Sequence, residues 1–245
     1  MKLYYNDIIT ESSVADFEQL YIDVRKTEKR IYTDEEVLQL PDISKSHLHY
    51  KEWKFRKESC ERLINYLKHR KTALHILEIG CGNGWLASKM ASLRNSVVTG
   101  LDINQPEIRQ ARRLFADRTN LDFIYGSIND VSYRKFDVIV FAASFQYFSI
   151  HDQIIEKCFQ LLKSKGEIHI MDTHFYKDLQ LQEARERTND YYCKLGYERM
   201  KAFYFHHSLE EFSSYNCNVL YNPFNIQNRI RFIKNPFYWV RLQHK

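Results

Sequence analysis

The sequence predicts an α/β fold in which a mostly parallel sheet of seven strands lies between two layers of helices. Between residues 74 and 172, short apolar runs alternate with longer amphipathic stretches, as in parallel sheets covered by helices. The run VIVFA within this region is typical of a strand that is buried on both faces. The 245 residues are enough for one domain with additions.

Five strands and three helices make up the alternating region. We expect strands at 74–79, 96–102, 121–125, 136–142 and 166–172, and helices near 84–93, 105–118 and 151–164. A last strand pair, at 217–222 and 237–243, is expected to be antiparallel with its rings facing the core. Trp239 and Leu242 should then be inaccessible. The alternative is that this basic, aromatic segment contacts a membrane surface or nucleic acid.

A glycine-rich turn follows the first strand. Gly80, Gly82 and Gly84 lie within LEIGCGNGWLA, between strand 74–79 and the next helix. Glycines at these positions permit positive φ and let backbone N–H groups approach a ligand closely. A dinucleotide turn needs its third glycine where Trp85 stands, and an ATP loop needs a GK[ST] ending that is missing. The alternative is a tight turn that binds no ligand.

This segment resembles motif I of class I S-adenosylmethionine-dependent methyltransferases, close to the type 11 small-molecule group. The resemblance covers residues 74–172 and implies a Rossmann-like three-layer sandwich with S-adenosyl-L-methionine as the cofactor. Within the turn, it implies cofactor-binding roles for Glu78, Gly80, Cys81, Gly82 and Gly84.

Asp102, at the end of strand 96–102, is the expected ribose-binding acid. It lies 18 residues beyond the last glycine of the turn, and a carboxylate accepts hydrogen bonds from both ribose hydroxyls. The resemblance implies that Ile103 flanks the adenine and that the backbone N–H of Ile128 meets a ring nitrogen. Ser127 stands where many family members have Asp, but its hydroxyl can also form a hydrogen bond. The alternative for Asp102 is a helix cap.

The loop that begins at Ala142 is expected to start the substrate pocket, because in the family it lies beneath the reactive sulfonium. The DPPY or NPPY tetrapeptide that holds a base amine in related enzymes is absent, as is the Pro-Cys pair used on cytosine. Asn-Pro-Phe at 222–224 and 235–237 follows the wrong strands and is expected to form turns. The acceptor is therefore expected to be a small molecule.

Methyl transfer from a sulfonium mainly requires alignment and exclusion of water, so the sequence does not place a general base. His174, His206 and Tyr147 are the catalytic candidates, and structural roles are the alternative for each. Tyr50 and Trp53, on the N-terminal helix, are expected either to contact the cofactor or to pack their rings on the core.

We predict an N-terminal helical lid at 1–56 and a Rossmann-like methyltransferase domain at 57–245, with a substrate-side insertion at about 174–207. The expected reaction moves a methyl group to an oxygen or nitrogen atom of a small molecule. One alternative is an RNA or protein methyltransferase of the same fold, which the basic C-terminal segment favours. The other is a non-catalytic module that binds S-adenosylmethionine.

Composition limits the partners. A net charge of +5 is too small for a dedicated nucleic-acid binder, so none is expected as a partner. Five scattered cysteines without a CxxC pair indicate reduced thiols in the cytoplasm and predict no metal site. Neither a signal peptide nor a membrane-spanning run is expected, and peripheral membrane contact is disfavoured.

Overall fold

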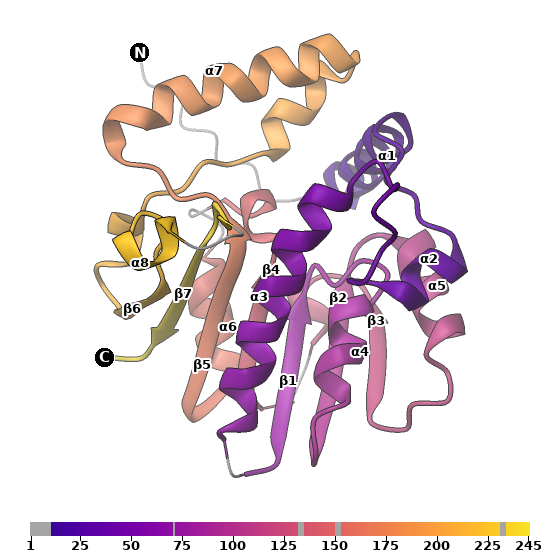
Figure 1. Ribbon diagram of the computed structural model, residues 1–245, viewed down its shortest axis with the longest axis vertical. Coiled ribbons are helices and arrows are strands. Elements are labelled where there is room, and N and C mark those ends of the chain that lie inside the picture. The colour runs from indigo at the N-terminus through magenta and orange to yellow at the C-terminus, as the bar shows by residue number, and fades with distance from the viewer. Residues whose placement is uncertain (1–10, 71, 132–134, 150–152, 231–233) are drawn as a thin grey trace.

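The computed structural model describes residues 11–70, 72–131, 135–149, 153–230 and 234–245. Seven strands form one sheet in the order β3-β2-β1-β4-β5-β7-β6 (Figure 1). Their bounds are β1 Leu74–Ile79, β2 Ser96–Asp102, β3 Leu121–Tyr125, β4 Phe136–Ala142, β5 Leu162–Thr173, β6 Asn216–Tyr221 and β7 Tyr238–Gln243. The predicted seven-stranded α/β fold is confirmed.

Among these seven strands, β7 alone runs in the direction opposite to the other six. Strands β1 to β5 pair in parallel, whereas Val240 on β7 lies opposite Ile170 on β5 and Val219 on β6 in antiparallel register. The predicted orientation of the last strand is therefore confirmed. β5 begins at Leu162, four residues before the predicted start. The sequence did not indicate this beginning, because the first residues of the strand are exposed and include the polar run KSK instead of an apolar pattern.

Helices cover both faces of the sheet. The α-helices are α1 Glu11–Thr27, α2 Asp34–Gln39, α3 Tyr50–Lys68, α4 Trp85–Ala91, α5 Gln105–Leu114, α6 Ile154–Leu161, α7 Asp178–Leu195 and α8 Ile226–Arg229. Short 3-10 helices are η1 Ile128–Asp130, η2 Phe145–Tyr147, η4 Glu198–Phe203 and η5 Leu209–Phe212. In Figure 1, α3 and α4 lie in front of the sheet and α6 lies behind it.

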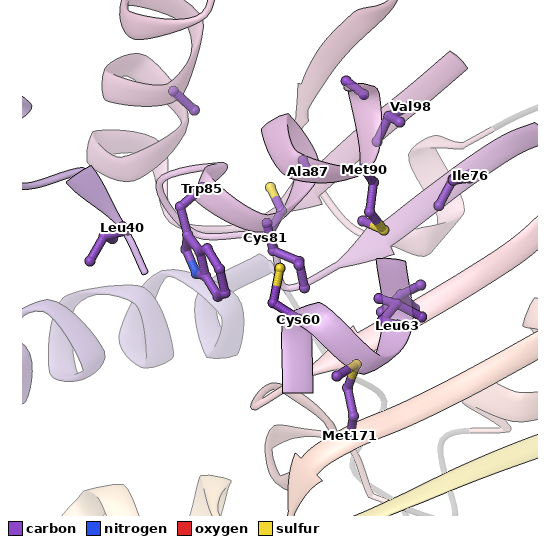
Figure 2. Packing of buried hydrophobic residues seen from close by; sticks show 14 of the residues in the cluster. Leu40, Cys60, Leu63, Ile76, Cys81, Trp85, Ala87, Met90, Val98 and Met171 are labelled. Carbon is purple, nitrogen blue, oxygen red and sulfur yellow. The ribbon is translucent and has the colours of Figure 1, made fainter. Parts of the chain in front are cut away.

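Alternate residues of the central strands supply two hydrophobic layers, because side chains of a strand point to opposite faces in turn. On one face, Ile76 packs with Leu63 of α3 and Met90 of α4 (Figure 2). On the other face, Ile139 packs with Ile155 of α6. These side chains are almost fully buried, and each contributes about 1.5–3 kcal/mol on transfer from water.

The N-terminal residues divide between the hydrophobic core and a group of helices, α1, α7 and η4, that we call the cap. Tyr32 and Leu40 join the hydrophobic layer of α3 and α4. α1 instead packs with α7 and η4 in a separate cluster around Val24 and Tyr192, and both long helices lie above the carboxyl ends of the parallel strands (Figure 1). α3 runs unbroken through the predicted domain boundary at 56/57, so the chain has no structural break there.

The C-terminal strand pair packs its rings inward. Trp239 is 7% exposed, Leu242 is fully buried, and Trp239 Nε1 donates a hydrogen bond of 3.1 Å to His169 Nδ1. These two side chains therefore cannot stack on lipid or bases, as expected. Arg231 and Phe232, in the same basic segment, lie outside the described residues.

Both Asn-Pro-Phe segments are turns. Asn222 Oδ1 accepts the N–H of Phe224 at 2.9 Å, and Asn235 Oδ1 accepts the N–H of Phe237 at 3.0 Å. Such side-chain turns begin at Asn because its short amide reaches the backbone two residues on. The prediction that these segments are turns is confirmed. In the described part of the chain, no helix is long and apolar enough to span a membrane.

Candidate functional site

The glycine turn joins β1 to α4 in left-handed backbone conformations. Gly80, Gly82 and Gly84 have φ values of +75°, +52° and +76°, which L side chains rarely adopt. At Gly80 a Cβ would also collide with the Cβ of Ser144, which follows β4. The turn can therefore lie against the loop after β4 only with glycine at this position.

Asp102 ties the ends of β1 and β2 together. Its Oδ2 accepts the N–H of Gly82 at 2.7 Å, and its Oδ1 accepts the N–H of Asn104 at 2.8 Å. Burial raises the pKa of Asp102 above its usual value, while the two N–H groups act in the opposite direction. The cap of α5 is Asn104, whose Oδ1 accepts the N–H of Glu107 at 3.3 Å, so the cap alternative for Asp102 is wrong.

Glu78, on β1 just before the glycine turn, connects β1 to the first turn of α4. Its carboxyl group is 2% exposed and accepts the backbone N–H of Ala87, in the first turn of α4. Burial and the nearby Asp102 charge raise the pKa of Glu78 well above its usual range. A buried carboxyl that accepts a helix N–H is consistent with the predicted role of shaping the turn.

The other expected cofactor residues lie along the same edge of the sheet or just behind it. Ile103 and Ala142 are half-buried at the ends of β2 and β4. Ser127 caps η1 by accepting the N–H of Asn129 at 3.3 Å, and Ile128 is the first residue of that short helix. The side chain of Cys81 is buried in the hydrophobic layer, and its Sγ donates to the carbonyl of Gly82 at 3.7 Å (Figure 2).

The two rings of the N-terminal helix take different positions. Trp53 is 3% exposed, donates from Nε1 to the hydroxyl of Tyr32 at 2.9 Å, and meets the Trp85 ring edge-on at 5.2 Å. Tyr50 is half-buried against the same hydrophobic layer, with the Lys54 ammonium over its ring. The contacts of both rings match the packing alternative.

The loop after β4 is held by polar contacts on both sides. Ala143 has a φ of +55°, and its N–H donates to the carbonyl of Met171 on β5 at 2.9 Å. Gln146 donates to the carbonyl of Ala143 at 2.7 Å and accepts from the Thr173 hydroxyl at 3.1 Å. A strained backbone residue with this many supports is typical of a functional loop.

Tyr147, at the end of that loop, lies within an aromatic cluster contributed by the cap. Its ring centre is 5.6 Å from that of Phe17, 5.5 Å from that of Tyr21 and 5.8 Å from that of Tyr204. Burial raises the pKa of the Tyr147 hydroxyl, so it stays protonated at neutral pH and can only donate or accept hydrogen bonds. Tyr147 thus forms one wall between the sheet edge and the cap.

The two candidate histidines contact the C-terminal turn and α7. His174 is exposed and stacks on Phe237, with ring centres 4.6 Å apart. His206 Nε2 shares a hydrogen bond of 2.8 Å with the Thr188 hydroxyl of α7. Burial lowers the pKa of His206 to about 4, so its ring is neutral at pH 7.

Two residues that sequence reasoning missed, Glu18 and Glu107, also reach this edge. Glu18 of α1 accepts the backbone N–H of Gln105 at 2.8 Å, at the start of α5. Glu107 lies beside Gly82, with Oε2 3.2 Å from the position of a Cβ on that glycine. Burial raises the pKa of Glu107 to about 7, with the Arg25 charge acting against it. The helical periodicity of α1 carried no signal of where that helix docks.

Near the end of β5, Asp172 forms a second polar cluster. It has a φ of +55°, and its Oδ1 accepts the hydroxyl of Ser59 at 2.5 Å. Asn235 donates to the Ser59 oxygen at 3.0 Å, which connects α3, β5 and the C-terminal turn. Burial raises the pKa of Asp172 to about 6, although the Arg56 charge lowers it.

Comparison with known sequences identifies the central part of the chain. Residues 76–166 match the family model described as a methyltransferase domain. A malonyl-[acyl-carrier protein] O-methyltransferase of Priestia megaterium is 31% identical over 118 residues, which cover 46% of this chain and 42% of the relative. A ubiquinone biosynthesis O-methyltransferase of Vibrio atlanticus is 30% identical over 112 residues, with coverages of 43% and 47%. The chain spans less than half the length of these two curated relatives.

Solved structures share the fold over nearly the whole chain. The plantazolicin methyltransferase BpumL, in complex with S-adenosylhomocysteine (SAH), has 15% identity and a TM-score of 0.56, covering 96% of this chain and 99% of that one. The magnesium protoporphyrin IX methyltransferase of Synechocystis PCC 6803, with bound SAH, has 12% identity and a TM-score of 0.60, with coverages of 94% and 100%. At these identities the likeness establishes the fold.

The fold and the glycine turn together define a Rossmann-like methyltransferase domain. The match at residues 76–166 shows that this central part of the chain is similar to a methyltransferase domain.

Proposed function

We propose that this protein transfers a methyl group from S-adenosylmethionine to an oxygen or nitrogen atom of a small-molecule acceptor. The observation that carries the proposal is the hydrogen bond at the carboxyl ends of β1 and β2, which the Gly82 N–H donates to Asp102. Open α/β sheets bind ligands outside these strand ends. Both curated relatives are O-methyltransferases by name, which favours oxygen as the acceptor atom.

The residues at this joint fit the cofactor. Each oxygen of Asp102 accepts one backbone N–H, and a carboxylate offers about four lone-pair positions, so roughly two remain for ribose hydroxyls. Gly80, Gly82 and Asp102 keep partial exposure within otherwise buried surroundings. We assign the three glycines and Asp102 to cofactor binding, with Ile103 and Ile128 beside the adenine.

The cofactor, when bound, supplies an electrophilic methyl carbon. The protein then has to align the acceptor and exclude water, and the supported loop from Ala142 to Tyr147 provides a fixed wall for both tasks. We propose that α1, within the N-terminal segment 1–56, and the insertion at 174–207 cover this wall as a cap, since α1 and α7 pack in one hydrophobic cluster. We assign no general base, because alignment of the acceptor and exclusion of water do not by themselves require one.

Two measurements test the proposal. Calorimetry with SAH should show saturable binding, and a screen of labelled S-adenosylmethionine against a metabolite extract should yield a methylated small molecule by mass spectrometry. SAH binding without transfer would favour a non-catalytic module. Transfer to macromolecules that falls with rising salt would favour the RNA or protein methyltransferase alternative. Absence of SAH binding at about 1 mM would contradict the proposal altogether.

A further inference from the structure

Arg25, in the last turns of α1, forms no close ion pair within the described residues, and the buried Glu107 interacts with its charge only at longer range. Its Nε is buried and has no hydrogen-bond partner, and no carboxylate of the described residues lies within 4.0 Å of its guanidinium. A guanidinium is always charged in proteins, and a buried N–H without an acceptor costs free energy. The side chain is therefore in a position that an anion would stabilise.

The surroundings of Arg25 restrict the shape of that anion. Its guanidinium carbon lies 5.5 Å from the centre of the Tyr21 ring, and the Tyr21 ring meets the Tyr147 ring edge-on. Phe17 and Tyr204 extend the same aromatic wall on either side of Tyr147. At these spacings the rings contact one another, so together they form a continuous aromatic surface on which a planar group can pack. The wall belongs to the cap and to the loop after β4, which we propose to enclose the acceptor.

We propose that Arg25 binds a carboxylate of the methyl acceptor, and that the acceptor is a planar organic acid held against the rings of Tyr21 and Tyr147. This inference rests on the proposed methyltransferase function and names its substrate class. Arg and carboxylate form paired, charge-assisted hydrogen bonds, so the buried Nε would gain its missing acceptor. The carboxylate of the cofactor has the same chemistry, and the experiment below separates the two sources.

The experiment measures binding to protein saturated with SAH. The probes are 4-hydroxybenzoate and its uncharged partner 4-hydroxybenzamide, which differ at the carboxylate alone. We expect the acid to bind the wild type at least about tenfold more tightly than the amide. Arg25→Gln should abolish this preference. Lys26→Gln, which removes a neighbouring exposed charge paired with Asp23, should preserve it.

A second measurement tests whether Arg25 serves the cofactor. Binding of SAH and of 5′-methylthioadenosine, which lacks the amino-acid part, is compared between wild type and Arg25→Gln. Unchanged SAH affinity supports the proposal and shows that the variant folds. A loss of about tenfold for SAH alone would assign Arg25 to the cofactor and overturn it. Equal affinity for acid and amide, or no binding of the acid at about 10 mM, would overturn it as well. Wild-type binding of SAH tests the proposed function separately.

Discussion

Replacement of Asp102 with Asn tests the joint between the glycine turn and β2. The wild-type carboxylate accepts one backbone N–H on each oxygen, at 2.7 Å from Gly82 and at 2.8 Å from Asn104. An amide has one oxygen and one NH₂ group, so one of these N–H groups would face a donor. Hydrogen bonds to charged groups contribute about 1.5–3 kcal/mol each. Removal of a buried charge offsets part of that loss, so the free energy of unfolding should fall by only about 1 kcal/mol.

The effect on cofactor binding should be larger. The variant loses the acceptor for at least one ribose hydroxyl, and a loss of about 1.5–3 kcal/mol weakens SAH binding by roughly 10- to 150-fold. Isothermal titration calorimetry measures the dissociation constant, and urea unfolding measures the stability. Asp117→Asn, the same change at an exposed position beyond α5, is the matched control and should bind SAH as wild type does. A folded Asp102→Asn variant with SAH affinity within about twofold of wild type would refute the assignment of Asp102 to the ribose.

Three further predictions concern stability. The pKa of Glu107 is raised to about 7, so the folded state binds its proton more tightly than the unfolded state and stability should fall as pH rises from about 4.5 to about 7. Glu107→Gln should flatten this decline in urea titrations, and an unaltered slope would contradict the shift. Gly80→Ala should lower the free energy of unfolding by more than left-handed strain alone, which costs about 1–2 kcal/mol, because the new Cβ would collide with Ser144. Gly196→Ala, where φ is +80° and nothing lies within 4 Å, should show the strain alone, so equal losses in both would argue against the collision. Burial alone would raise the pKa of Glu167, but hydrogen bonds from His169 and Tyr66 and the Arg70 charge lower it to about 2. Its stabilisation is therefore present above about pH 4.5 and is lost as pH falls towards 2; Glu167→Gln should unfold about 3 kcal/mol more easily at neutral pH, and a loss under about 0.5 kcal/mol would exclude a paired buried charge.

The sheet and the glycine turn were readable from the sequence because their signals are local. A strand covered on both faces must be apolar along its length, as β4 is, and a turn with positive φ at alternate residues needs glycine there. Asp102 was also predictable, since the carboxyl ends of neighbouring parallel strands meet at one edge. The two Asn-Pro-Phe turns were also predictable, because each depends on only three consecutive residues.

The cap was decided only by the tertiary structure. Tyr21 and Arg25 reach the site because α1 docks on η4 and on the loop after β4, more than 120 residues later in the chain. Helical periodicity shows that a helix has an apolar face but not which surface that face meets. The same limit applies to Trp53, whose spacing suited a cofactor contact and core packing equally until Tyr32 and Trp85 were seen beside it. The sequence by itself therefore determined the class of fold and the positions of the glycine turn and Asp102, whereas the groups that we propose to face the acceptor depend on contacts between distant segments.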